Sequence, residues 1–152
     1  MASDGAARTA TADIAIATAA PSDLVNVTDE VRSVVADAGI QTGFALVSSP
    51  HTTCAVIVNE AEPGFENDFK AALERMAPTD AHYDHNDAPH DEEDEAPNGY
   101  AHVRAAILSS SSVVLPVRDG ALALGRWQRI FFVELDRARP RTCQITVVGR
   151  AV

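Results

Sequence analysis

The most constraining feature of the chain is a series of strand-length apolar segments separated by turn residues. Residues 8–17 alternate apolar and polar positions, and residues 42–48, 53–59 and 141–149 are short apolar runs. Asp119–Gly120 lies between two further short runs and is typical of a tight hairpin turn. Segments of this length and pattern predict β-strands, and strands joined by short turns pair in antiparallel fashion.

Helical segments interrupt these strands. Residues 25–40 carry apolar side chains at helical spacing, with Thr28 as the expected N-cap and Gly39 at the end. Residues 62–77 and 98–109 show a similar spacing. The mixed order of strands and about three helices predicts an α+β fold with a mainly antiparallel sheet.

Two segments lack the pattern of a packed element. Residues 79–97 hold eight acidic residues and no Lys or Arg, so they are expected to form a long surface loop with a solvated acidic part at 91–95. Residues 1–7 are expected to be a flexible N-terminus. The whole chain, residues 1–152, has the size of a single domain.

Composition argues against several classes of partner. The formal net charge is −10, which disfavours nucleic acid and anionic membranes because phosphate binding needs a basic patch. No apolar run has the length that crosses a bilayer, and the N-terminus lacks a basic segment followed by an apolar one. We therefore expect a cytoplasmic protein, in which Cys54 and Cys143 are small buried residues rather than a disulfide.

Three of the five histidines lie at the edges of predicted elements. His51 precedes a strand, His85 lies in the polar loop, and His102 lies in the first turn of a helix. Imidazole is a common ligand for zinc and related ions, and three protein ligands leave a coordination position open for chemistry. The alternative is three unrelated surface or capping histidines, and spacing alone does not decide between the two.

Two further segments carry polar groups in unusual places. Within residues 127–136, alternation places Gln128 and Glu134 on the same strand face as bulky apolar side chains. They lie either at an edge or interface, or they orient a substrate or a metal ligand. The four serines at 109–112 could hold a phosphate, although such a run is also typical of a plain helix-to-strand loop.

Several motifs occur in one order along the chain. They are "PHTTCAVIVNE" at 50–60, "YDHND" at 83–87, "AHVRAAIL" at 101–108 and "LPVRDGALALGRWQRIFFVELD" at 115–136. This combination resembles the family named for secondary thiamine-phosphate synthase activity. The likeness extends over roughly residues 8 to 150.

The resemblance implies a closed, mainly antiparallel barrel assembled as a homotrimer. It also implies that His51, His85 and His102 bind a divalent metal, with zinc expected and magnesium as an option for a diphosphate substrate. Tyr100 stands where the family often has a further histidine, so a fourth ligand is not expected.

The activity implied by the resemblance joins a pyrimidine diphosphate to a thiazole phosphate, with release of pyrophosphate. His51 would then be a metal ligand or general base, and Gln128 and Glu134 would complete the catalytic set. The substrate- and cofactor-binding residues would be Thr52, Thr53, Asn59 and Arg129.

Two other functions stay open on the same residues. Dispersed histidines equally suit metal-assisted hydrolysis of a small phosphate or ester, with a His or Glu134 as general base. A non-enzymatic protein that binds a metal or metabolite is the third class. The expected partner is a small phosphorylated substrate. Arg104, Arg126 and Arg129 are candidates to stabilise the charge of the leaving group in the synthase reaction, unless they form surface ion pairs.

Overall fold

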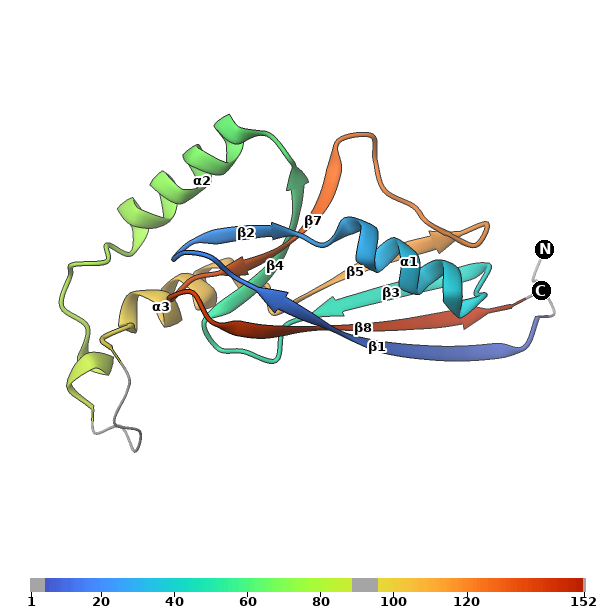
Figure 1. The fold of residues 1–152 in the computed structure, drawn as a ribbon, viewed down its shortest axis with the longest axis horizontal. Coiled ribbons are helices and arrows are strands. Elements are labelled where there is room, and N and C mark those ends of the chain that lie inside the picture. The colour runs from blue at the N-terminus through green and yellow to red at the C-terminus, as the bar shows by residue number, and fades with distance from the viewer. Residues whose placement is uncertain (1–4, 89–95, 152) are drawn as a thin grey trace.

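Antiparallel pairing of eight strands builds the protein, as a computed structural model shows for residues 5–88 and 96–151 (Figure 1). The strands are β1 (Ala7–Ala17), β2 (Asp23–Asn26), β3 (Thr42–Ser48), β4 (Cys54–Glu60), β5 (Ser112–Arg118), β6 (Ala121–Leu122), β7 (Gln128–Glu134) and β8 (Pro140–Arg150). The helices are α1 (Thr28–Ala38), α2 (Pro63–Met76), α3 (Gly99–Leu108) and a short 3₁₀ helix, η1 (Asp84–Asp87).

The strands form two sheets. The larger has the order β1-β8-β3-β5-β6, and the smaller has the order β2-β7-β4. In the smaller sheet Cys54 lies opposite Glu134 and Glu60 lies opposite Gln128, so the β4–β7 pair has one polar position at each end. The predicted strand residues of the site lie near one or the other of these two ends.

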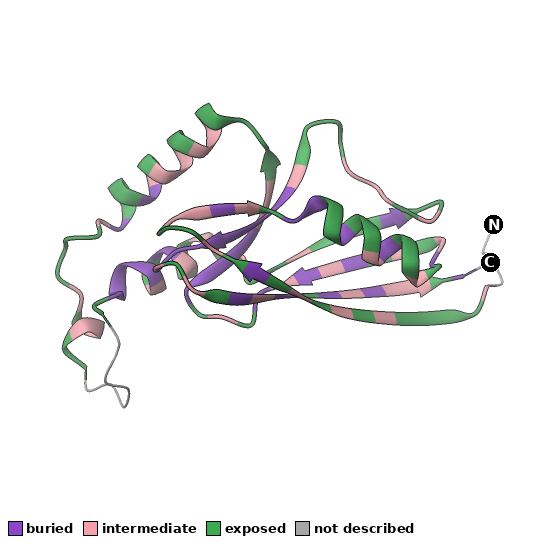
Figure 2. Ribbon diagram, viewed as in Figure 1, coloured by how far each residue is buried: buried purple, intermediate pink, exposed green. Residues whose placement is uncertain are grey.

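The core lies on both sides of β7. Ile130 and Phe132 join a cluster with α1 and the larger sheet, whereas Phe131 and Val133 join a second cluster with α2 and α3. All residues from Ile130 to Glu134 are buried, and so are the first three residues of β4, which pairs with this strand (Figure 2). Because side chains alternate along this strand, the apolar residues within 127–136 pack alternately into one cluster and the other.

Local signals explain where α1 begins and ends. Asn26 Oδ1 accepts hydrogen bonds from the backbone N–H and the hydroxyl of Thr28, and Thr28 Oγ1 accepts from the Ile130 N–H. Thr28 is thus the first helical residue, and the expected N-cap position belongs to Val27. Gly39 ends the helix in the left-handed conformation at φ 63°, as its residue type predicts.

The prediction of a single α+β domain with mainly antiparallel strands and about three helices is confirmed, but the closed barrel is wrong. Closure requires the ladder to return to its first strand. Here the larger sheet ends at β1 on one side and at the two-residue β6 on the other, and it curves into a half-barrel. α1 contacts β1, β6 and β8 and so covers the opening (Figure 1).

Two elements depart from the sequence interpretation. β2 was not predicted, because four residues are too few to show an alternating pattern. The segment predicted as a loop at 79–97 contains η1, and its acidic part at 91–95 lies outside the described residues. The first four residues of the predicted flexible N-terminus also lie outside the described part, whereas β1 already begins at Ala7.

Within residues 5–88 and 96–151, no helix is long and apolar enough to span a membrane. The longest, α2, has 14 residues, and one side of it is exposed to solvent.

Candidate functional site

His51 lies in the loop between β3 and β4, where it completes a strand ladder. β3 ends at Ser48, which pairs with Gln144 of β8. The N–H of Thr142, two residues earlier in β8, therefore has no partner on β3. His51 Nε2 accepts this N–H at 3.0 Å. A neutral ring that accepts through Nε2 carries its proton on Nδ1.

The surroundings of His51 favour its neutral form. Burial and the nearby Arg141 charge lower the pKa of His51 below its usual 6.5, while Glu134 opposes them. The effect of Arg141 exceeds that of Glu134, so this ion pair presents a net positive potential to the imidazole.

The other two candidate histidines lie beside each other. His85 in η1 and His102 in α3 have ring centroids 4.3 Å apart with planes tilted by 50°. His102 also lines the same two cavities as His51. The fold therefore brings the three sequence-predicted histidines to one side of the protein.

Two neighbouring cavities meet at His51, Thr52 and His102. The first, here the arginine cavity, has a volume of about 230 Å³ and is also lined by Pro50, Thr53, Asn98, Arg139 and Arg141. The second, here the serine cavity, has a volume of about 390 Å³ and is also lined by Cys54, Ala105, Ala106 and Ser109–Ser111. Because they share three residues, we treat them together as the composite cleft.

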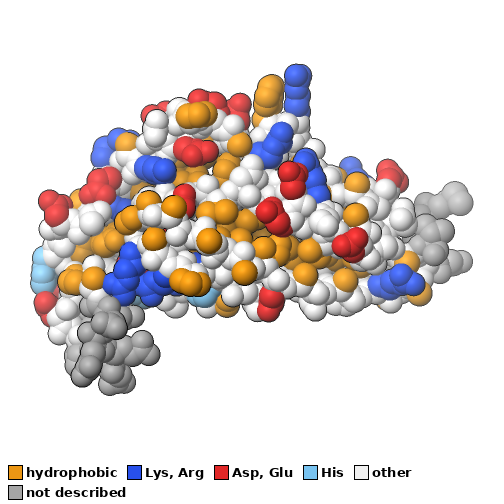
Figure 3. Space-filling view, in the orientation of Figure 1, with side chains coloured by type: hydrophobic (Ala, Val, Ile, Leu, Met, Phe, Trp, Pro, Cys, Tyr) orange, Lys and Arg blue, Asp and Glu red, His pale blue; other side chains and the backbone are white. Residues whose placement is uncertain are grey.

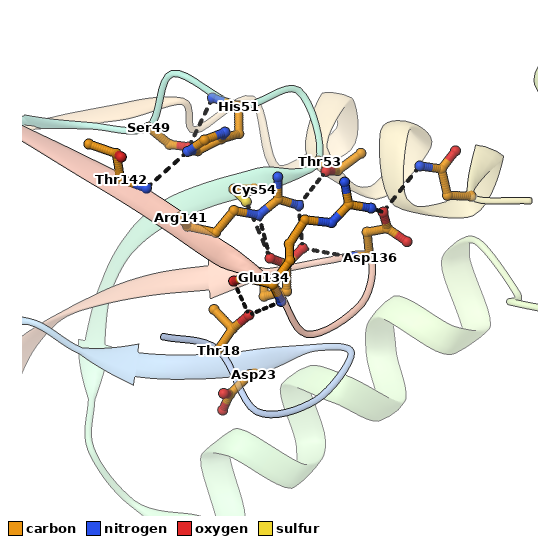
Figure 4. A network of polar contacts seen from close by, with 12 residues as sticks. Thr18, Asp23, Ser49, His51, Thr53, Cys54, Glu134, Asp136, Arg141 and Thr142 are labelled. Carbon is orange, nitrogen blue, oxygen red and sulfur yellow. Dashed lines mark hydrogen bonds and ion pairs between the residues drawn. The ribbon is translucent and has the colours of Figure 1, made fainter. Parts of the chain in front are cut away.

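Arg141, which lines the arginine cavity, forms a buried ion pair with Glu134 (Figure 4). Arg141 donates from Nε and Nη2 to the two oxygens of Glu134, at 2.6 and 2.8 Å, and from Nη2 to Thr53 Oγ1 at 2.9 Å. The Glu134 side chain is fully buried and that of Arg141 is 7% exposed. Within the described residues Nη1 makes no hydrogen bond, and Arg141 lines the cavity.

Both carboxylate oxygens of Glu134 accept hydrogen bonds, which bears on its predicted catalytic role. Besides Arg141, Oε1 accepts from the Asp136 N–H, and Oε2 lies 3.9 Å from the Cys54 thiol. Burial, followed by the Glu134 charge, raises the pKa of Cys54 to about 12, so the thiol stays protonated. These contacts indicate that Glu134 positions Arg141, and its role as general base stays a prediction.

A second arginine borders the same cavity. Arg139 forms an ion pair with Asp136, which also accepts from the Asn98 side-chain amide. The Arg139 N–H donates to Thr18 Oγ1, whose hydroxyl donates to the Arg139 carbonyl. The loop between β7 and β8 is thereby fastened to the end of β1.

The histidines do not form a compact metal-binding group. Within the described part of the chain, only His82, Asp84 and Asp87 place three potential ligand atoms within 4.8 Å of one another, and all three residues are exposed. In addition, His51 uses its Nε2 lone pair for the Thr142 N–H. The arrangement does not fit a metal ion held by His51, His85 and His102. The divalent metal, zinc or magnesium, stays a prediction on which we base no chemistry.

Other predicted site residues lie at the opposite end of the β4–β7 pair. Gln128 and Asn59 line a cavity of about 370 Å³ with Arg126 and Trp127, and Arg129 lies next to it. Gln128 and Glu134 lie six positions apart along β7, which corresponds to about 20 Å. Within one chain, Gln128, Asn59 and Arg129 therefore do not share a site with His51, Thr52 and Thr53.

The remaining arginine candidates have structural contacts. Arg104 is buried, donates to the Ala77 carbonyl at the end of α2, and pairs with Glu74. Arg126 lies over the exposed Trp127 ring, 4.7 Å from its centroid. Neither lines the composite cleft.

Sequence reasoning missed Arg139, Arg141 and Asn98. A signal for Arg141 was present: it lies in phase with Cys143, Ile145 and Val147, which all face the core from β8. A guanidinium at a core-facing strand position predicts a buried acidic partner. No comparable periodicity distinguishes Arg139, which lies in a loop.

Comparison with known proteins identifies relatives over nearly the full chain. A family model described as "UPF0047 protein YjbQ-like" matches residues 12–150. A UPF0047 protein of Methanothermobacter thermautotrophicus is 36% identical over 140 residues, covering 92% of each chain. The Bacillus subtilis protein YugU is 34% identical over 128 residues, covering 84% of this chain and 90% of its own.

Solved structures agree. A YbjQ-like protein of unknown function from Sulfolobus solfataricus superposes with a TM-score of 0.87 at 33% identity, covering 95% of this chain and 100% of its own. A hypothetical protein from Aeropyrum pernix gives a TM-score of 0.84 at 33% identity, covering 93% and 99%.

These relatives correct the functional interpretation of the sequence. The matched proteins are described as UPF0047 members or as proteins of unknown function, and none of these descriptions mentions thiamine phosphate, zinc or metal-dependent catalysis. The assignments to a thiamine-phosphate synthase family, to that activity and to metal-dependent hydrolysis are therefore wrong on this comparison. The chain belongs to the YjbQ-like UPF0047 family.

Proposed function

We propose that the composite cleft binds a small metabolite that carries a phosphate or carboxylate group. The observation that supports this most directly is the Arg141 guanidinium. Glu134 and Thr53 hold Nε and Nη2, so the plane of the group is fixed while Nη1 is left for a ligand. A preorganised guanidinium loses little conformational entropy when it binds an oxyanion.

The electrostatics of the cleft support an anionic ligand despite the negative net charge. Arg139 and Arg141 line the arginine cavity, whereas their partners Asp136 and Glu134 do not. The carboxylates thus lie behind the guanidinium groups, and after burial, which is the larger cause, the Arg141 charge contributes to the lowered pKa of His51. An anion bound there would be attracted by the guanidinium groups more strongly than it is repelled by the buried carboxylates.

Binding of phosphate and pyrophosphate, measured by titration calorimetry, tests the proposal. The variant Arg141→Gln with Glu134→Gln removes both charges and keeps a polar, hydrogen-bonding side chain at each position. Loss of a charge-assisted hydrogen bond predicts about 10- to 100-fold weaker binding. Arg126→Gln with Glu60→Gln is the matched control, because it neutralises an arginine and a glutamate at the opposite end of β4.

Two results would overturn the proposal: no binding by the unmodified protein, or equal affinities of the cleft variant and the control. If the cleft variant does not fold, amide chemical shifts of the unmodified protein decide the matter. Added phosphate should then perturb Thr52, Thr53 and Thr142 and leave Gly125 and Gln128 unchanged.

We also propose a cytoplasmic location and no nucleic-acid partner. Cys54 and Cys143 are both buried free thiols, which suits a reducing compartment. The net charge of −10 argues against phosphate backbones as partners.

The predicted homotrimer is likewise a proposal. Along β3 and its neighbours, side chains that alternate with the core face outward and are mostly apolar: Phe44, Leu46, Val114, Pro116 and Val148. Val114 is 62% exposed and Phe44 is 42% exposed, so this face of the larger sheet suits burial against other copies. Light scattering should give a mass of three chains, and Val114→Lys should lower it.

A further inference from the structure

The two halves of the composite cleft lie at opposite ends of α3. Asn98, which precedes the helix, lines the arginine cavity, whereas Ala105, Ala106 and Ser109 at its end line the serine cavity. A helix carries partial positive charge at its N-terminus and partial negative charge at its C-terminus. The cleft is therefore polarised along its length, with the arginines at the positive end.

The serine cavity has the character of a site for hydrogen-bond donors. The last turn of α3 contains no basic residue, and Ser109 ends the helix in the left-handed conformation at φ 47°. Neither Lys nor Arg lines this cavity. A positively charged or donor group placed there would be stabilised by the helix dipole.

The serine segment is held rigidly, which makes it a defined wall. Ser110 accepts the Val56 N–H with its carbonyl and donates its hydroxyl to the Val56 carbonyl, and the Ser111 carbonyl accepts the Ser49 N–H. Within the described residues, the hydroxyls of Ser109 and Ser111 make no hydrogen bond. They are available to a ligand in the cavity that they line.

We infer that the ligand of the composite cleft is a small zwitterion, with its anionic group in the arginine cavity and a protonated amine in the serine cavity. This inference rests on the proposed function and adds the chemistry of the second end. His51, Thr52 and His102 line both cavities, so one molecule can extend from one to the other. An amine at the end of α3 would also meet no competing cation from the protein.

Two ligands of equal heavy-atom number, both long enough to extend from the arginine cavity toward the end of α3, test the inference: 6-aminohexyl phosphate and n-heptyl phosphate. Calorimetry should give roughly two- to fivefold tighter binding for the amine, as expected for a cation at a helix C-terminus. Ser111→Ala should reduce this ratio. Ser112→Ala is the matched control, because Ser112 is an exposed neighbour that does not line the cavity, and it should keep the ratio.

The outcomes separate this inference from the proposed function. If neither phosphate binds, the proposed function itself fails. If both bind equally, or if Ser111→Ala and Ser112→Ala give the same ratio, the cleft still binds anions but the amine site is refuted. The two serine variants share one net charge, so a general attraction of the acidic protein for amines cannot produce a difference between them. If Ser111→Ala does not fold, the amide shift of Ser111 in the unmodified protein should respond to the amine and not to the heptyl compound.

Discussion

The two ends of the β4–β7 pair carry similar residue types in opposite environments. At the Cys54–Glu134 end, polar side chains are buried and are tied to β8 through Arg141. At the Glu60–Gln128 end, polar side chains are exposed and bond locally, as when Gln128 accepts the Gly125 N–H. Figure 3 shows apolar and basic side chains projecting together above this second end of β7.

The comparison shows that the contribution of a polar strand residue to stability depends on the side chains that it contacts. A buried carboxylate without a partner costs several kcal/mol, so Glu134 requires Arg141. Trp127, by contrast, is 61% exposed, and the neighbouring Arg126 lies over its ring. The first end should therefore be sensitive to substitution and the second tolerant.

Replacement of Arg141 by Ala should have the largest effect on stability. It leaves the Glu134 charge buried without compensation, so the free energy of unfolding should fall by about 3–5 kcal/mol. Urea denaturation measures the change. Arg126→Ala at the exposed end should alter the same quantity by less than about 0.5 kcal/mol. Similar losses in the two variants would contradict the contrast between the ends.

Replacement of Thr53 by Val should have an intermediate effect. The Thr53 side chain is buried and its hydroxyl accepts from Arg141 Nη2, so the loss leaves a guanidinium N–H without its acceptor. We expect a destabilisation of about 1–3 kcal/mol. The adjacent Thr52 is exposed, and Thr52→Val is the matched control with little expected change. Equal midpoints in urea would show that the Thr53 contact is not needed.

Periodicity predicted the strands and helices well because both patterns are local. Ile130 and Phe132 alternate with Phe131 and Val133, and this period of two correctly indicated a strand. That both faces of the strand are buried is a finding of the structure. Closure of the barrel was not predictable in this way, since it depends on whether β1 and β6 meet. That outcome is set by three-dimensional curvature and by α1 in the opening.

Part of the site was predictable from the pairing of neighbouring strands. His51, Thr53 and Glu134 come together because antiparallel pairing places Cys54 opposite Glu134. Gln128 was grouped with them from its place in the same motif, yet position within a motif carries no information on distance along a strand. Arg141 comes from a different sheet, and only the packing of one sheet on the other brings it to Glu134.

The pH dependence of stability should give the smallest effect and tests the environment of His51. Its pKa is lowered in the folded protein, so between 6.5 and that lower pKa the unfolded chain binds more protons. Stability should therefore fall as the pH decreases from about 7 through 6.5, by less than the loss for Thr53→Val.

His51→Gln removes the titrating group while its amide oxygen can still accept the Thr142 N–H. Urea denaturation across this range should show a shallower slope for the variant than for the unmodified protein. Identical slopes for His51→Gln and the unmodified protein would mean that His51 does not experience the burial and positive potential on which the anion-binding proposal depends.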